Sequence, residues 1–163
     1  MIRQIAPEDA AEFLKLGRRL DEETRLMMLE PGERALTVEQ QRERIEQVLA
    51  SENRTVLLAL SRGQVIGFLE ALGGEYRRNR GTAHVVIGVL REFRGQGVGT
   101  KLFDSLEDWA HARGIHRLEL TVMTHNPAVA LYRRVGFEVE GTRRHSLLVD
   151  GTYVDEYYMS RLL

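Results

Sequence analysis

A glycine-rich stretch carries the residues whose types and spacing most directly suggest chemistry: Arg94, Gly95, Gln96, Gly97, Val98, Gly99 and Thr100. The flanking residues predict a buried strand over 84–90 and an amphipathic helix over 98–113. The first N–H groups of a helix lack intrahelical acceptors and lie at the positive end of its dipole. Glycines would admit a bulky anion to these donors, and the Arg94 fork suits phosphate oxygens. The stretch therefore predicts a pyrophosphate cradle, and the alternative is a flexible connector.

Two other phosphate-binding motifs fit this stretch less well. A P-loop closes with Gly-Lys followed by Ser or Thr, but Thr100 separates Gly99 from Lys101 here. A dinucleotide fingerprint matches Gly95 and Gly97 but needs a third glycine where Thr100 stands. Too few residues follow the predicted helix to complete a doubly wound nucleotide domain. The dinucleotide interpretation is therefore the weaker one.

A second motif lies further along the chain, where the block from Asn126 to Tyr132 is followed by Gly136-Phe137. The Arg-x-x-Gly-x-Gly pattern at 94–99 is similar to the acetyl-CoA signature of the GCN5-related N-acetyltransferase (GNAT) superfamily. The second block resembles that family's Asn…Ala…Leu-Tyr…Gly-Phe motif, and the similarity in layout covers nearly the whole chain. The resemblance implies an N-acetyltransferase in which a primary amine attacks the thioester of acetyl-CoA directly.

The resemblance also implies roles for individual residues. In the family, backbone groups of the strand before the glycine turn contact the pantetheine arm and polarise the thioester carbonyl, which maps to Val89 and Leu90. Tyr132 matches the tyrosine taken as general acid for the leaving thiolate. The family asparagine precedes that tyrosine by seven residues, a position filled here by His125, so Asn126 either contacts coenzyme A or only caps a helix. The expected coenzyme A contacts are Val89, Leu90, Arg94, Gly95, Gln96, Gly97, Val98, Gly99, Thr100, Asn126 and Tyr132.

The general base stays open at this stage. His84 precedes the motif on its strand, and an imidazole suits proton transfer near neutral pH. Glu119 lies on the next predicted strand, and Glu30 lies in the segment 21–35, which in the family walls the acceptor site. A water relay would need none of them in direct contact. We favour His84 and Glu119 equally.

The acceptor is narrowed only by analogy. The closing hairpin, from Gly136 onward, resembles that of bacterial acetyltransferases acting on free amino acids or protein N-termini. A primary amine of a small amino-acid-like molecule or a protein N-terminus is therefore expected, while aminoglycosides, polyamines and amino-acid-like herbicides remain open as acceptors. The rival interpretation is a non-catalytic acyl-CoA-binding or sensor domain. Another is a nucleic-acid-binding module on the arginine-rich loop 73–81, although such loops are more often solvated hairpin ends.

Composition limits the remaining possibilities. The 163 residues, 43% hydrophobic and 29% charged, predict one domain over 1–163, and the net charge of −1 gives no pull toward nucleic acid or membrane. The absence of cysteine excludes a thiol nucleophile, disulfides and a cysteine-ligated metal, and the histidine spacing indicates no metal site. No segment reads as a targeting or membrane-spanning sequence, so a cytoplasmic protein is expected.

Periodicity predicts a mixed α/β sheet with helices packed on it, in the order β-α-α-β-β-β-α-β-α-β-β. The resemblance implies the same fold, with about seven mostly antiparallel strands and four helices. Thr37 and Gln40 form a capping-box pattern, and Arg62-Gly63 and Asp150-Gly151 are two-residue hairpin signals. Apolar residues of the last strand, such as Tyr153 and Met159, either pair two copies as a homodimer or complete the core. The expected strands cover 2–5, 55–60, 64–72, 84–90, 117–124, 137–149 and 152–159.

Overall fold

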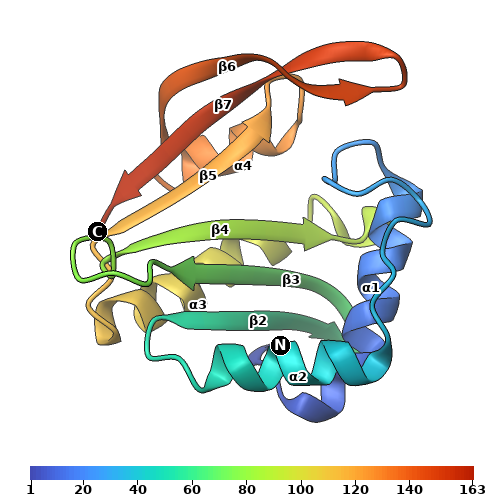
Figure 1. Cartoon of the computed structure of the whole chain (residues 1–163), viewed down its shortest axis with the longest axis vertical. Coiled ribbons are helices and arrows are strands. Elements are labelled where there is room, and N and C mark those ends of the chain that lie inside the picture. Colours follow the sequence, from blue (N-terminus) through green and yellow to red (C-terminus); the bar gives the residue numbers. More distant parts are fainter.

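The computed structural model describes residues 1–163 and contains one seven-stranded sheet in the order β1-β2-β3-β4-β5-β7-β6 (Figure 1). The parallel pair β4–β5 is the exception in a sheet whose other neighbours are antiparallel. The predicted mixed sheet and element order are confirmed. The elements are β1 (Ile2–Gln4), α1 (Ala10–Glu23), α2 (Val38–Leu49), β2 (Arg54–Ser61), β3 (Gln64–Gly73), β4 (Thr82–Val89), α3 (Val98–Ala112), β5 (Arg117–Met123), α4 (Ala128–Arg134), β6 (Glu138–Val149) and β7 (Thr152–Leu162), with short 3₁₀ turns at Pro7–Asp9 and Arg91–Phe93.

Local sequence signals set most of the element boundaries. The hairpin turns have positive φ at both central residues, 50° and 78° at Arg62-Gly63 and 48° and 79° at Asp150-Gly151. This is the backbone that a two-residue hairpin with right-handed twist requires. The Thr37 hydroxyl accepts the Gln40 N–H at 3.1 Å, and the Gln40 side chain accepts the Thr37 N–H at 3.0 Å. The predicted capping box and both predicted hairpins are therefore confirmed.

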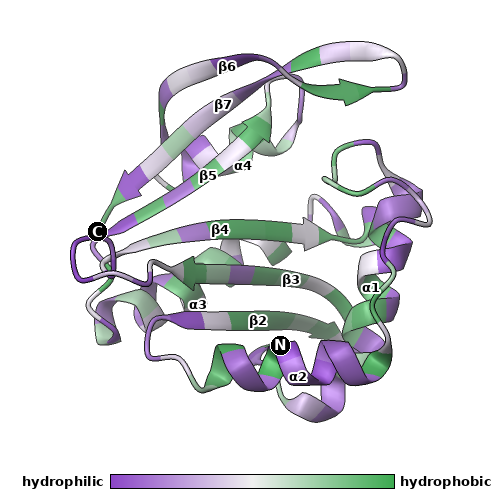
Figure 2. Cartoon of the chain, viewed as in Figure 1, coloured by the Kyte–Doolittle hydropathy of each residue, from purple (hydrophilic) through white to green (hydrophobic).

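The helices cover the middle of the sheet on both faces. Helices α1 and α2 pack against β2 and β3 on one face, while α3 lies behind these strands on the other (Figure 1). Figure 2 shows apolar colour along most of β2, β3 and β4, and β2 and β3 are buried on both faces over most of their length. Strands β6 and β7 are mixed in colour because their hairpin leaves more surface in water. No helix combines the length and the apolarity that crossing a bilayer requires.

The closing hairpin divides its apolar residues between core and surface. Met159 is 1% exposed and belongs to the core, whereas Tyr153 is 60% exposed. Part of this strand therefore completes the core, which was one of the two roles expected for its apolar residues. Pairing of two copies through the exposed part stays a prediction, which sedimentation at micromolar concentration would test.

Strands β4 and β5 pair only at their beginnings. The pairing runs from Thr82 with Arg117 to His84 with Glu119, and beyond it the two strands share no register. Further along, β4 pairs only with β3 and β5 only with β7. The two ribbons diverge accordingly in Figure 1. The sheet is therefore split along half of its length.

The split leaves one edge of β4 without a partner strand. The Leu90 N–H donates to Ile66 at 2.9 Å and the Thr82 carbonyl accepts from Gly74 at 3.1 Å, so even-numbered residues bond toward β3. Successive residues in a strand direct their backbone groups to opposite sides. The odd-numbered residues beyond the last pair, Val85, Ile87 and Val89, therefore direct theirs toward the gap.

A buried ion pair holds the segment 24–36, which connects α1 to α2. The Arg34 guanidinium forks onto the Asp21 carboxylate at 2.8 and 3.0 Å, and Asp21 is only 1% exposed. Gly17 allows this approach, because a Cβ there would lie 2.8 Å from Arg34 Nε. Helix α1 ends at Glu23, directly before this segment. Asp21 therefore holds the segment in place, since Arg34 bonds to both of its oxygens.

We predict that Arg34→Ala lowers the free energy of unfolding by about 3–5 kcal/mol, because it leaves the buried Asp21 carboxylate without a partner. Arg42→Ala is the matched control, since it breaks the exposed pair with Glu39 and should cost less than about 1 kcal/mol. Urea unfolding of both variants measures the difference. Equal losses would show that the Asp21 pair does not anchor the segment.

Candidate active site

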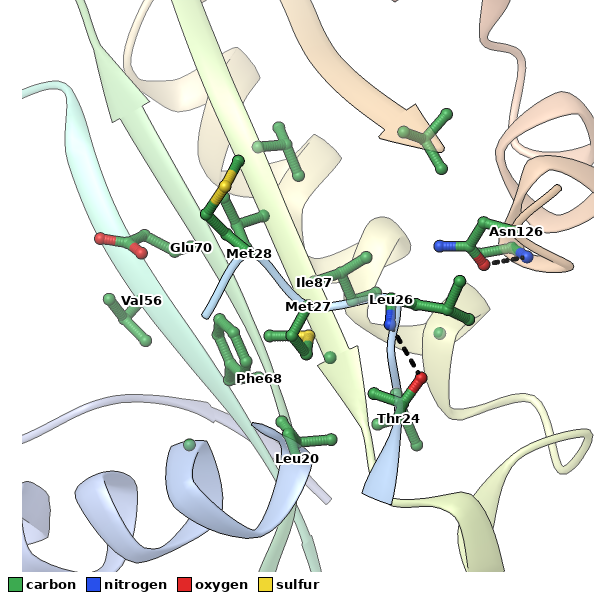
Figure 3. A pocket seen from close by; sticks show the side chains of 18 of the residues that line it. Leu20, Thr24, Leu26, Met27, Met28, Val56, Phe68, Glu70, Ile87 and Asn126 are labelled. Atoms are coloured by element: carbon green, nitrogen blue, oxygen red, sulfur yellow. Dashed lines mark hydrogen bonds between the residues drawn. The ribbon is translucent and has the colours of Figure 1, made fainter. Parts of the chain in front are cut away.

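A cavity of about 1030 Å³ lies where β4 and β5 part. Its walls come from the end of α1, the segment 24–36, β4, the glycine turn and the start of α4. Both motifs predicted from the sequence therefore face one space. Figure 3 shows this space with Met27 and Leu26 on one side and Asn126 on another.

The glycine turn presents a row of free donors to this cavity. The N–H groups of residues 95–100 make no hydrogen bond within the protein, and the first helical bond of α3 is Lys101 N–H to Gly97. These donors lie at the positive end of the α3 dipole. Such an arrangement accepts an anion with several oxygens. The fold thus provides the donor row that the sequence predicted.

The three glycines serve two different purposes. Gly95 and Gly97 have φ of 72° and 81°, a backbone that other residues rarely adopt, and a Cβ on either would meet nothing within 4 Å. A Cβ on Gly99 would instead lie 2.6 Å from Leu131 Cδ2 in α4. The prediction that all three glycines clear space for an anion is thus wrong for Gly99, which admits Leu131.

Arg94 is turned back toward the end of β4. Its Nε donates to the Val89 carbonyl at 2.9 Å, which closes that acceptor on the free edge. No carboxylate pairs with Arg94, so the rest of its guanidinium remains available to an anion at the turn. Gln96 donates to the Glu92 carbonyl at 2.9 Å and does not line the cavity. Arg94 is therefore placed for the expected contact, whereas the Gln96 side chain serves the turn.

Val89 and Leu90 differ in what they offer the cavity. Val89 lines it, and its N–H points to the gap by the alternation described above. Leu90 is 1% exposed, its N–H donates to Ile66, and its carbonyl accepts from Phe93 at 2.9 Å. The expected contact through Leu90 is therefore not met, because both of its backbone groups are bonded within the protein.

Tyr132 lies in α4 and lines the cavity beside the turn. Its ring packs edge-on against Phe103 and also contacts Phe137, each with centroids 6.0 Å apart. Burial raises the pKa of the Tyr132 phenol well above its ordinary value. The hydroxyl makes no hydrogen bond to another residue, so it is a neutral donor held in position by apolar packing.

Asn126 caps the first turn of α4. Its Oδ1 accepts the Ala128 N–H at 2.8 Å, so the helix-cap alternative is confirmed. Asn126 also lines the cavity, and in Figure 3 its amide nitrogen points away from the helix. The cap leaves that donor free, so a contact with coenzyme A stays a prediction.

The three candidate bases are separated by the fold. His84 lines the cavity, is exposed, and makes no hydrogen bond through its ring. Glu119 lies outside the cavity and pairs with Arg117 at 3.0 Å, and Glu30 is exposed and also lies outside. The structure therefore brings only His84 to the cavity. Its contact with a substrate amine stays a prediction.

Sequence reasoning missed one acid in the cavity. Glu70 stands in the middle of β3 and lines the cavity from the face covered by α1 and α2 (Figure 3). Its carboxylate makes no hydrogen bond or ion pair in the protein. Burial raises the pKa of Glu70, and the charges of Arg44 and Arg34 partly offset the rise. The sequence contained a sign of this role, because Glu70 is the one charged residue in the apolar run 65–72.

The structure contains no group of three or more His, Cys, Asp or Glu side chains arranged to hold a metal ion. The cavity offers hydrogen-bond donors, a tyrosine, a histidine and one unpaired carboxylate.

Comparison with known proteins adds independent information. Residues 19–137 match the model of the acetyltransferase (GNAT) family. The L-amino acid N-acetyltransferase AaaT of Escherichia coli is 34% identical over 111 residues, which cover 65% of this chain and 67% of that protein. An acetyltransferase of the GNAT family from Streptococcus pneumoniae superposes with a TM-score of 0.96 at 31% identity, over 100% of this chain and 99% of that one. A phosphinothricin acetyltransferase from Sinorhizobium meliloti, solved in complex with acetyl-CoA, shares the fold at 23% identity with a TM-score of 0.86, over 100% and 88% of the two chains.

We predict that Arg94→Ala weakens the binding of coenzyme A by about 10- to 150-fold, which corresponds to roughly 1.5–3 kcal/mol for a hydrogen bond to a charged group. Arg77→Ala is the control, because Arg77 is exposed in the loop 73–81 and lies outside the cavity. Titration calorimetry measures both affinities. An unchanged affinity in folded Arg94→Ala would remove this residue from the anion site.

Proposed function

The chain belongs to the acetyltransferase (GNAT) family, and from this premise we propose that it transfers the acetyl group of acetyl-CoA to the amine of a small, amino-acid-like acceptor. N-Acetyl transfer is the family activity. One observation carries the assignment of the site: the free N–H row of residues 95–100, the open edge of β4 and the Tyr132 hydroxyl face the same cavity. A non-catalytic sensor would need only the free N–H row and the open edge of β4, and not the Tyr132 hydroxyl.

The residues present fit acetyl-CoA. Acetyl-CoA supplies an activated acetyl thioester and carries a pyrophosphate and an extended arm with two amides. The N–H row and Arg94 would hold the pyrophosphate, because they provide converging donors at a helix N-terminus. The odd-numbered backbone groups of β4 would pair with the amides of the arm, as an added strand pairs with a sheet edge. The site thereby explains both the free edge and the free turn.

The chain's own groups can stabilise the charges that acyl transfer creates. The Val89 N–H points into the gap and would donate to an oxygen on which negative charge develops. Tyr132 is neutral and has a free hydroxyl, so it would deliver a proton to a departing thiolate. His84, or water held near it, would take the proton of the attacking amine. These groups line one cavity, and these proton transfers and the charge stabilisation require that they do.

One exposed contact beside the cavity supports a small acceptor over a protein N-terminus. Arg25, in the segment 24–36, pairs at 3.1 Å with Asp150 in the turn between β6 and β7. This contact spans the two elements that flank the cavity, as Figure 1 shows for their facing tips. A polypeptide acceptor would need a groove open between them. The 34% identity to an L-amino acid N-acetyltransferase points the same way.

The proposal is tested by thiol release from acetyl-CoA with a panel of L-amino acids, peptides with free N-termini and aminoglycosides. We expect turnover with free amino acids and a lower kcat/KM for peptides, since a peptide would have to open the exposed Arg25–Asp150 pair. Faster turnover with peptides would contradict the proposed amino-acid acceptor and indicate a protein N-terminus instead. Acetyl-CoA binding without turnover on any amine would favour the sensor.

We predict that Tyr132→Phe reduces kcat by about 10²-fold, the low end for loss of a general acid, because thiolate is a fair leaving group. Acetyl-CoA affinity and stability should survive, since the ring still packs on Phe103 and Phe137. The raised pKa keeps the phenol protonated at neutral pH and through pH 10, so wild-type kcat should show no fall from its ionisation below that pH. Stopped-flow measurement of the chemical step checks both points. A kcat within threefold of wild type would show that Tyr132 only packs.

A further inference from the structure

Glu70 is an acid in the cavity that the mechanism above does not use. It pairs across the sheet with Val56 in β2 and Val86 in β4, so it stands in the middle of the floor of the cavity. Its neighbours on the strand, Leu69 and Ala71, are fully buried on the opposite face. The Glu70 side chain is therefore directed to the face that α1 and the segment 24–36 cover. Figure 3 shows it there, near Val56.

The charges around Glu70 leave its carboxylate unpaired. Arg34 is committed to Asp21 through two hydrogen bonds. Arg44, on α2, is exposed and forms no ion pair, and it contributes only through its longer-range charge. No other residue donates to the Glu70 oxygens. A half-buried carboxylate without a donor is unfavourable for stability, so this acid is suited to a ligand that brings a donor.

Apart from Arg34 and Arg44, the side chains beside the carboxylate are apolar. Phe68 lies two residues before Glu70 on the same face, and Leu20, Met27 and Met28 line the same side of the cavity (Figure 3). Met27 and Met28 belong to the segment that the buried ion pair anchors. Thioether side chains adapt to flexible aliphatic ligands. The subsite thus combines a flexible apolar wall with the Glu70 carboxylate, whose two nearby cations are the Asp21-bound Arg34 and the exposed Arg44.

The position of Glu70 separates it from the reacting amine. The free edge of β4 faces the gap, and β4 itself lies between that edge and β3, which carries Glu70. Neighbouring strands are about 4.8 Å apart, so the gap lies roughly 5–10 Å from the Glu70 backbone. Direct proton transfer needs about 2.6–3.2 Å between heavy atoms. Glu70 therefore stands one strand farther from the gap than the edge of β4, which leaves its carboxylate to a second group of the acceptor.

We propose that Glu70 selects acceptors that carry a second cationic group on an aliphatic stem, as basic amino acids do. This inference rests on the acetyl transfer proposed above and names the acceptor class of the same site. The ammonium or guanidinium tip donates to the Glu70 carboxylate, and the methylene stem lies against Phe68 and Met27. The other amine of the acceptor is then directed across β4 to the gap.

The test compares acceptors that differ by one amino group, L-lysine against L-norleucine and L-ornithine against L-norvaline. In the wild type we expect kcat/KM to be about 10- to 150-fold higher for the cationic member, the range of a charge-assisted hydrogen bond. Glu70→Gln should remove most of that preference and change the neutral member by less than about threefold. Glu43→Gln on α2 is the control, because Glu43 is exposed, unpaired and outside the cavity.

Two further measurements keep the outcomes distinct. Thermal unfolding should show Glu70→Gln to be at least as stable as wild type, since it removes an uncompensated charge. Calorimetry with L-lysine in the presence of coenzyme A measures binding without turnover. If lysine binds to the wild type and not to Glu70→Gln, the subsite is upheld. If the protein at the same time turns over no amine, only the proposed acetyl transfer is overturned. Equal effects of Glu70→Gln on cationic and neutral acceptors, or no wild-type preference, would overturn the inference.

Discussion

The site depends on the early end of the pairing between β4 and β5. After His84 and Glu119 the two parallel strands separate, and β4 keeps a free edge inside the protein. Backbone donors and acceptors in such a place are costly unless something pairs with them. An extended ligand arm supplies these partners, so the split sheet is half of a binding site by its geometry alone. The cavity, the free N–H row and Tyr132 are all arranged around this gap.

The close packing of α3 on α4 brings the second half of the site to the gap. Gly99 lets Leu131 approach the first turn of α3, and Tyr132 is the next residue in α4. Phe103 in α3 then packs edge-on against the Tyr132 ring. The donor row at the start of α3 and the phenol in α4 are thus fixed relative to each other by apolar contacts. This apolar packing orients the Tyr132 ring and leaves its hydroxyl without a hydrogen-bond partner in the protein.

The ionisable side chains in the walls of the cavity and behind them divide into paired and unpaired ones. Asp21 is bonded by Arg34, and the buried Glu156 accepts from Ser146 at 2.8 Å. These acids hold the walls in position, since each satisfies its charge inside the chain. Glu70 and Arg94 form no ion pair, so their charged groups remain available, Glu70 on the acceptor side and Arg94 at the glycine turn. The distribution separates groups that build the cavity from groups available to ligands.

The amino-acid sequence by itself determined the elements and the local backbone. Hydrophobic periodicity, the Thr37 cap, the hairpin dipeptides and the glycine turn each act over a few neighbouring residues, so their outcome does not depend on the rest of the fold. The family motifs likewise located the turn and Tyr132. Only the tertiary structure decided which backbone groups face the gap, because that depends on the register of β3 with β4. Register places the Val89 N–H at the gap and bonds Leu90 to Ile66. Packing between distant segments likewise set Leu131 against Gly99 and left Glu70 unpaired in the cavity, and no spacing along the chain encodes such contacts.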